Sequence, residues 1–329
     1  MNKKNFFIAA LGTAALALSL TACSGNKEPK GSSEGELSGE ISLSGAYALY
    51  PLAVRWANEF KKLHPRVKIN VTAGGASKGF YDAISGIVDF GMVSRELRPA
   101  EVESGAVGFA VAKDAVVPTI NAKNPVFAEL KKRGIKRSDF IALWINGENK
   151  TWGQIVGICK NNPVTVYTRS DACGAAETWA LFLGKKQEDL KGTAVFGDPG
   201  MVSAILDDVN GIGLNNIEYA YDSKTGKPIP GIAVAPIDID GNGQIDPQED
   251  FYDFRESVMT AIADGRYPSP PAREIYFVSK GVPTDPVAVA FLQYILTDGQ
   301  KDNVRQGYIS ISQEKLDASL KLLGVKSEQ

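Results

Sequence analysis

Three glycine-rich loops, each lying between a β-type segment and a helical pattern, constrain the fold of this 329-residue chain most. They read Gly45-Ala46-Tyr47-Ala48, Gly74-Gly75-Ala76-Ser77-Lys78-Gly79 and Arg169-Ser170-Asp171-Ala172-Cys173-Gly174. Strand, loop and helix in repeated order are typical of an α/β fold with a mainly parallel sheet. A helix start carries unpaired backbone N–H groups and a partial positive charge, and glycine lets a ligand approach that backbone. The loops therefore predict a site for an anion or polar solute, with Arg169 as its charged member.

The order of the elements indicates two lobes. We expect residues 39–116 and 275–329 in the first lobe and residues 117–274 in the second. The runs 107–112 and 116–120 are apolar and rich in β-forming residues, and the second is expected to cross between the lobes. Two amphipathic helices, near 287–296 and 300–306, are expected to close the chain. Leaving a lobe and returning to it makes a two-strand hinge, and the crevice between lobes is a usual place for a small ligand.

Residues 1–22 are typical of a secretory signal peptide, because Lys3 and Lys4 precede an apolar run. The next motif, Leu20-Thr21-Ala22-Cys23, resembles the bacterial lipoprotein box, which predicts cleavage before Cys23 and lipidation of that residue. An ordinary signal peptide with a chance cysteine is the alternative. Residues 23–38 are rich in Ser, Gly, Glu and Lys and are expected to tether the protein to the membrane on its extracytoplasmic side.

The charge of the chain gives no support for a nucleic-acid partner. The formal net charge is −2, and about −4 without Lys3 and Lys4, whereas nucleic-acid binding needs a basic face. Export would permit a disulfide between Cys159 and Cys173. A predicted strand of roughly 16 Å lies between them, and a bridge needs Cα atoms within about 7 Å, so the pairing is disfavoured but open.

Residues 238–249 fit the twelve-residue calcium loop throughout. The ligand positions fall on Asp238, Asp240, Asn242, Gln244, Asp246 and Glu249, with Gly243 at the sharp turn. Hard oxygen ligands at this spacing favour Ca²⁺ over Mg²⁺ or zinc. A strand-like segment precedes the loop, an exit helix is expected from Pro247 and Glu249, and no second loop follows. The pattern therefore predicts a structural Ca²⁺ clasp and not a sensor; a solvated acidic turn is the alternative.

The segment Gly75-Ala76-Ser77-Lys78-Gly79 also matches the Gly-x-Ser-x-Gly pattern of hydrolase nucleophiles. A serine nucleophile needs a base. The single histidine, His64, precedes the intervening strand while Ser77 follows it, which separates them by over ~20 Å. We therefore expect no enzyme, and a Ser77→Ala variant would test the hydrolase alternative.

Five segments together are similar to the phosphate-binding proteins of bacterial ABC transporters. They are residues 44–52 with Trp56, 73–97, 143–147 with Thr151-Trp152, 169–175 and 299–309. The resemblance spans nearly the whole mature chain. It implies a two-lobed type II periplasmic-binding-protein fold of the venus flytrap kind, which binds an oxyanion between its lobes and delivers it to a permease. A sensory or adhesive protein that reuses the fold is the rival function.

The resemblance also implies a ligand site in which Arg169 pairs with the anion and with Asp171. Backbone N–H groups near Tyr47, Ser77 and Ala175 would donate as well. The implied set is Gly45, Ala46, Tyr47, Ala48, Ala76, Ser77, Ser94, Arg95, Arg169, Asp171, Cys173, Gly174 and Ala175.

This chain departs from the family's pattern at the loops. Hydroxyl side chains of the family are replaced at Ala46, Tyr47 and Ala76 and across residues 173–175, so up to five donors are missing. Each hydrogen bond to a charged group is worth about 1.5–3 kcal/mol. Tyr47, Ser94, Arg95 or Ser170 could replace those donors. The alternatives are another anion, a larger one, or a ligand that is no anion.

Overall fold

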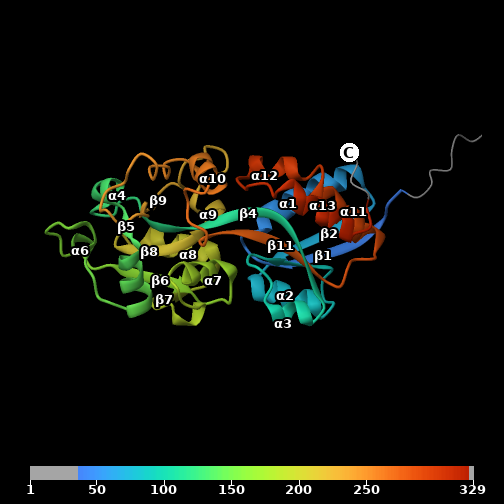
Figure 1. Ribbon diagram of the computed structural model, residues 1–329, viewed down its shortest axis with the longest axis horizontal. Helices are drawn as coiled ribbons and strands as arrows, with labels where there is room; N and C mark the ends of the chain where they lie inside the picture. Colours follow the sequence, from blue (N-terminus) through green and yellow to red (C-terminus); the bar gives the residue numbers. More distant parts are fainter. Residues whose placement is uncertain (1–35, 326–329) are drawn as a thin grey trace, which may run out of the picture. The chain divides into compact units, whose positions relative to one another are not determined.

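The computed structural model describes residues 36–325, which form a mixed α/β fold whose long strands connect two lobes (Figure 1). The strands are β1 (Gly39–Gly45), β2 (Val67–Ala73), β3 (Phe90–Val93), β4 (Ala106–Asn121), β5 (Ile135–Lys136), β6 (Thr165–Arg169), β7 (Thr193–Val195), β8 (Gly211–Asn216), β9 (Ile232–Val234), β10 (Ile237–Asp238) and β11 (Ala272–Lys280). One sheet has the order β2-β1-β3-β11-β4-β8-β6-β7, with β9 beside β4. β5 and β10 pair separately.

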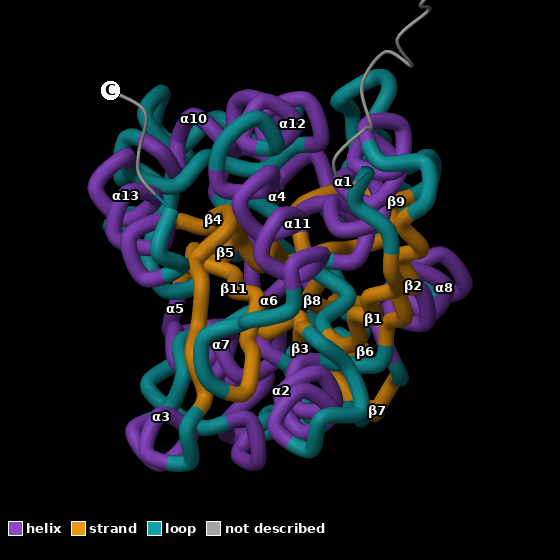
Figure 2. The backbone as a smooth tube through the Cα atoms, turned by 90° about the vertical axis from the view of Figure 1, so that its right-hand side faces the viewer, coloured by secondary structure: helices purple, strands orange, loops and turns teal. Residues whose placement is uncertain are grey.

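Helices surround these strands in the end-on view (Figure 2). They are α1 (Tyr50–Leu63), α2 (Ala76–Ile84), α3 (Pro99–Glu103), α4 (Phe127–Arg133), α5 (Arg137–Ile141), α6 (Trp152–Val156), α7 (Gly174–Phe182), α8 (Gly197–Asp207), α9 (Ile217–Ala220), α10 (Arg255–Ala263), α11 (Pro286–Leu296), α12 (Gln300–Gln306) and α13 (Gln313–Leu322). A π-helical turn, η1 (Ala142–Asn146), and a 3₁₀ turn, η2 (Gln187–Asp189), complete the set. Both lobes belong to one compact unit, residues 37–329.

The first lobe places two of the glycine-rich loops at one sheet edge. β1 runs parallel to β2 and to β3, so the loops after β1 and β2 both follow carboxyl ends of strands, where α/β folds bind ligands. Helix α1 starts with Pro51 in its first turn, where a missing N–H costs nothing. Its apolar face, with Trp56 and Phe60, is fully buried against the sheet.

The hinge consists of β4 and β11, which pair antiparallel from Ala115 opposite Ala272 to Ala106 opposite Lys280. β4 then continues into the second lobe beside β8, with Val116 opposite Asn216. Both apolar runs, 107–112 and 116–120, belong to this one strand, and its second part crosses into the second lobe as predicted. Two polar residues, Lys113 and Asp114, lie between the two apolar runs. Asp114 is buried in the hinge and pairs with Arg273 at 3.2 Å.

The second lobe has its own core, in which three tryptophans are fully buried: Trp144, Trp152 and Trp179. β6 runs parallel to β8 and β7, and the third glycine-rich loop connects β6 to α7. Arg169 is the last residue of β6. The strand therefore delivers this side chain to the edge at which α7 begins.

Two helix predictions were wrong. A further helix, α13, follows the two that were expected to end the chain, and it buries Leu316 and Leu320 on the first lobe. The helix after the calcium loop begins at Arg255, not near Pro247. The carbonyl of Tyr252, in the segment before this helix, accepts a hydrogen bond of 2.7 Å from the Tyr221 hydroxyl.

Residues 36–325 include no helix that is long and apolar enough to cross a membrane. The predicted signal peptide and the predicted lipidation site, Cys23, lie outside the described residues.

Candidate functional site

The second and third glycine-rich loops touch each other. The Ser77 amide donates to the Ala172 carbonyl at 3.4 Å. Gly75 has a φ of +97°, and a Cβ there would lie 3.4 Å from the Asp171 carboxylate. Loops from the two lobes thus meet beside Asp171.

The Arg169 guanidinium lies at the centre of this meeting point. Its Nε and Nη2 donate to the two carboxylate oxygens of Asp171 at 2.8 and 2.7 Å, and its Nη1 donates to Asp198 at 2.8 Å. The Arg169 side chain is only 1% exposed. Burial alone would lower the pKa of Arg169, but nearby negative charge, led by Asp198, outweighs burial and raises it. Burial alone would raise the pKa of Asp171, but the hydrogen bonds and charge of Arg169, together with backbone hydrogen bonds such as that from Gly197, outweigh burial and lower it.

Asp198 is a site residue that the sequence analysis missed. It is fully buried at the start of α8 and accepts hydrogen bonds from the Asn216 amide and side chain at 2.9 and 2.8 Å. The Asn215 side chain lies at 3.3 Å. Gly197 and Pro199 beside it are a helix-start signal that could have drawn attention to this position.

Tyr47 of the first loop covers the guanidinium. The Arg169 carbon lies 5.9 Å from the centre of its ring, within cation–π range. The ring also packs edge-on against Phe196 and Tyr219. Gly197, with a φ of +70°, leaves room for it, because a Cβ there would come within 3.2 Å of the ring. The first loop therefore reaches the same place as the other two.

The remaining residues of the first two loops are tightly packed. The Ala46 amide donates to Met92 at 2.8 Å, and the Ala48 carbonyl accepts from the Tyr308 hydroxyl at 2.7 Å. Gly45 lies against Gly79, where a Cβ would clash. Ala76 is buried at the start of α2. Small residues at these positions therefore allow the loop backbones to pack closely against their neighbours.

The third loop ends at Cys173, which caps α7. Its sulfur accepts from the Ala176 amide at 3.5 Å, and burial raises the pKa of the thiol to about 12. Cys173 and Cys159 are both free. Gly174 lies against Ser94, whose backbone and hydroxyl would clash with any Cβ there. Ala175, the next residue of α7, is buried.

Arg95, which is predicted to contact the ligand, pairs with two carboxylates in this structure. It donates to both oxygens of Glu101 at 2.7 Å, and its Nε lies 2.9 Å from Glu177 on α7. Arg98 donates to both oxygens of Glu177 at 3.0 Å. These four residues, which we call the interlobe latch, connect the segment after β3 to α7.

A chain of buried polar groups leads from the site to the hinge. Arg273 donates to the side chain of Asn216, which donates to Asp198. Burial raises the pKa of Asp114 to about 6. Burial, reinforced by the charge of Asp114, also raises the pKa of Glu218 well above its ordinary value.

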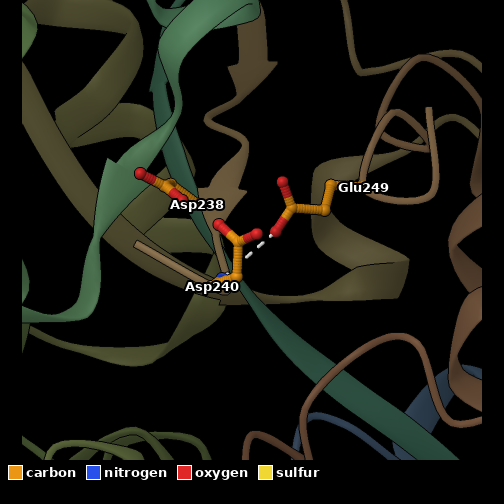
Figure 3. Close-up of side chains that lie close together, drawn as sticks. All are labelled: Asp238, Asp240 and Glu249. Atoms are coloured by element: carbon orange, nitrogen blue, oxygen red, sulfur yellow. Dashed lines mark hydrogen bonds between the residues drawn. The ribbon is translucent and has the colours of Figure 1, made fainter. Parts of the chain in front are cut away.

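The predicted calcium ligands Asp238, Asp240 and Glu249 converge (Figure 3). An oxygen from each lies within 4.8 Å of the others. Glu249 accepts from the Ile239 amide at 2.7 Å, and the Asp238 oxygens accept from the amides of Gly241 and Gly243 at 2.8 Å. The loop backbone therefore wraps around its own carboxylates.

The other positions of the loop fit the same arrangement. The side chain of Asn242 donates to Asp240 and Asp246 at 3.0 Å and accepts from the Gln244 amide at 2.8 Å. Gly243 has a φ of +84°, a conformation that favours glycine. The Ile245 amide donates to the Lys132 carbonyl at 2.8 Å, which anchors the loop to α4.

The residues of the hydrolase alternative, His64 and Ser77, lie on different helices. His64 ends α1, and its ring lies 4.5 Å from that of Phe60. Ser77 belongs to the first turn of α2.

Comparison with known proteins matches this architecture. A model of the PBP superfamily domain matches residues 30–299. The phosphate-binding protein PstS of Pseudomonas aeruginosa is 27% identical over 313 residues, covering 88% of this chain and 88% of that protein. The PstS protein of Staphylococcus aureus (strain USA300) is 23% identical over 319 residues, covering 94% of this chain and 90% of that protein.

Among solved structures, a Clostridium perfringens protein with bound phosphate aligns with a TM-score of 0.68 and 20% identity. The alignment covers 83% of this chain and all of that one. The predicted two-lobed type II fold is thus confirmed.

Proposed function

Because this chain belongs to the PBP superfamily, we propose that it is an extracytoplasmic solute-binding protein that captures phosphate or a related oxyanion. Its PstS relatives are named for phosphate binding. The superfamily consists of solute-binding proteins, which favours binding over catalysis.

The observation that carries the proposal is the geometry of Arg169. A guanidinium has five N–H groups, and three of them donate to Asp171 and Asp198. Nη1 and Nη2 each keep one further N–H group, which an oxygen of an oxyanion could accept from. At the start of α7, the amides of Gly174 and Ala175 lack intrahelical acceptors and favour negative charge. The hydroxyls of Tyr47 and Ser170 are further candidate donors.

We propose capture by lobe closure about β4 and β11. Contacts between the lobes favour the closed form, including the ring of Tyr47 over Arg169 and the pair of Arg95 with Glu177. Opening would give a solute access to the guanidinium. An ABC transporter permease would receive the solute, and a lipid on Cys23 would hold the protein at the membrane.

We also propose that residues 238–249 bind a structural Ca²⁺. The convergence of Asp238, Asp240 and Glu249 supports a cation there, and oxygen donors suit Ca²⁺. The loop joins β10 to the turns before α10 and pairs through β10 with β5. A bound ion would therefore fasten three segments of the second lobe.

Isothermal titration calorimetry with inorganic phosphate tests the proposed ligand site. An Arg169→Lys variant keeps a positive charge between Asp171 and Asp198 but cannot form the bidentate hydrogen bonds of a guanidinium. We expect its phosphate affinity to fall by about tenfold to a hundredfold.

The matched control is Arg305→Lys, since Arg305 is exposed on α12. It should bind phosphate like the unmodified protein. Unchanged phosphate affinity in a folded Arg169→Lys protein would remove Arg169 from the site.

A further inference from the structure

Glu218 carries a buried carboxyl group that no neighbouring side chain satisfies. It lies on α9, directly after β8, and both of its side-chain oxygens are buried. No other residue of the described chain donates a hydrogen bond to either oxygen. An ionised carboxylate in this place would lose its hydration without gaining hydrogen bonds. The surroundings therefore favour the neutral, protonated acid.

The charges around Glu218 act in the same direction. They are the carboxylates of Asp114 on β4 and Asp198 on α8 and the guanidinium of Arg273 on β11. Arg273 already pairs with Asp114 at 3.2 Å and donates to the side chain of Asn216. Burial, reinforced by the charge of Asp114, accordingly raises the pKa of Glu218 well above its ordinary value.

Glu218 lies where the second lobe meets the first. Its charge acts on Tyr308, which is buried in the core of the first lobe and donates to the Ala48 carbonyl at 2.7 Å. The next residue on α9, Tyr219, donates to the Tyr47 carbonyl of the first lobe at 3.4 Å. Burial raises the pKa of both phenols, so they carry no charge near neutral pH. Separation of the lobes would remove first-lobe groups from around α9 and admit water.

We propose that Glu218 couples solute capture to the uptake of a proton, being protonated when the lobes are closed and ionised when they are open. This inference rests on the proposed function, because it concerns the closure by which the solute is captured. In the open form, water hydrates the carboxylate, which ionises at neutral pH like an exposed glutamate. Closure removes this water, and the carboxylate takes a proton from the solvent. A lower pH therefore favours the closed form and tightens solute binding.

A purely structural role for Glu218 makes a different prediction. If Glu218 is equally buried in both forms, it keeps its proton throughout, and its replacement changes the affinity by the same factor at every pH. Proton-coupled closure makes that factor depend on pH. The number of protons taken up on binding and the pH dependence of the affinity are therefore the quantities to measure.

Isothermal titration calorimetry with inorganic phosphate, in two buffers of different ionisation enthalpy, counts the protons taken up. Between pH 7 and pH 8, above the pKa of about 6 of Asp114, the unmodified protein should take up about one proton more than Glu218→Gln. Glutamine has the charge of the protonated acid at every pH, and the protonation of phosphate itself is common to both proteins. The affinity of Glu218→Gln relative to the unmodified protein should rise by about threefold to tenfold over this pH unit, tenfold being the limit for one proton.

The matched control is Glu314→Gln, which removes the same charge from an exposed position on α13. It should take up as many protons as the unmodified protein. Small-angle X-ray scattering of the free protein gives a second measurement. The radius of gyration of the unmodified protein should rise between pH 6 and pH 8 as the open form gains population. If circular dichroism shows that Glu218→Gln does not fold, this rise decides alone.

The inference fails if folded Glu218→Gln takes up as many protons as the unmodified protein, or if their affinity ratio is constant between pH 7 and pH 8. With an unfolded variant, a constant radius of gyration has the same meaning. Failure of the unmodified protein to bind phosphate or another oxyanion would overturn the proposed function instead. The scattering of the free protein would then still show whether closure depends on protonation.

Discussion

Asp114 is the residue from which a pH effect on stability follows most directly. It is fully buried in the hinge, and burial raises the pKa of its carboxyl to about 6, against the pull of Arg273. Between its ordinary value and about 6, the folded state therefore holds a proton that the unfolded state has released. The contribution of Asp114 to the free energy of unfolding therefore falls as pH rises through this range.

Urea unfolding at several pH values measures this contribution. The Asp114→Asn variant cannot ionise, so the loss of stability between pH 4 and pH 6 should be smaller in the variant than in the unmodified protein. Asp207→Asn, at an exposed position, should keep the original slope. Equal slopes in all three proteins would mean that Asp114 titrates in the folded state as it does in the unfolded one.

The sequence predicted one part of the arginine's surroundings and missed another. Arg169 and Asp171 are two positions apart in one loop, so their pairing can be read from a resemblance at that loop. Asp198 lies 29 positions from Arg169 and reaches it only because β8 brings Asn216 beside the start of α8. Similarly, Arg95 forms ion pairs with Glu101 and Glu177. The spacing of these residues in the sequence does not reveal the pairs.

At the scale of elements, the calcium loop gives a prediction about thermal stability. Adding a chelator such as EGTA should lower the melting temperature, because Ca²⁺ bound only to the folded state stabilises it. Free Ca²⁺ at about a hundred times its dissociation constant adds about 2.7 kcal/mol to the free energy of unfolding. For a chain of this size, that corresponds to a rise in melting temperature of roughly 5 °C. Differential scanning calorimetry measures the shift.

The Glu249→Gln variant should melt at the same temperature with and without Ca²⁺, since the expected two-oxygen ligand is lost. Glu256→Gln, exposed on α10, should respond like the unmodified protein. Mg²⁺ should restore less stability than Ca²⁺. A melting temperature unaffected by EGTA would identify residues 238–249 as a solvated turn.

Local pattern predicted most elements, and tertiary contacts decided the exceptions. Alternation and helical spacing place β2 and α1 correctly, because each buries one face. The polar Asp114 interrupts the apolar pattern of β4, and only its partner Arg273 on β11 makes its burial possible. α13 has a narrow apolar face, and its buried residues are Leu316 and Leu320. So few apolar residues give only a weak sequence pattern from which to predict the helix.

At the scale of the whole molecule, the two-lobed fold was predictable from the order of elements. The described part of the chain begins and ends in one lobe, and its middle carries a separate set of strands. The contacts that cross between the lobes were not predictable, since they join residues such as Arg98 and Glu177 that lie 79 positions apart. If the lobes open and close as we propose, these contacts would set the balance between the open and closed forms.

The interlobe latch therefore yields a prediction about closure. Glu177 on α7 pairs with Arg95 at 2.9 Å and with Arg98 at 3.0 Å. A Glu177→Gln variant loses both ion pairs, while Arg95 keeps its pairing with Glu101. Because a partly exposed pair is worth up to about 1 kcal/mol, the open form should gain population and phosphate affinity should fall by about fivefold.

Small-angle X-ray scattering of the free variant should show a larger radius of gyration than that of the unmodified protein, and saturating phosphate should remove the difference. Glu103→Gln, exposed on α3, should change neither quantity. If Glu177→Gln scatters and binds phosphate as the unmodified protein does, the latch contributes nothing to closure and the loops around Arg169 alone hold the lobes together.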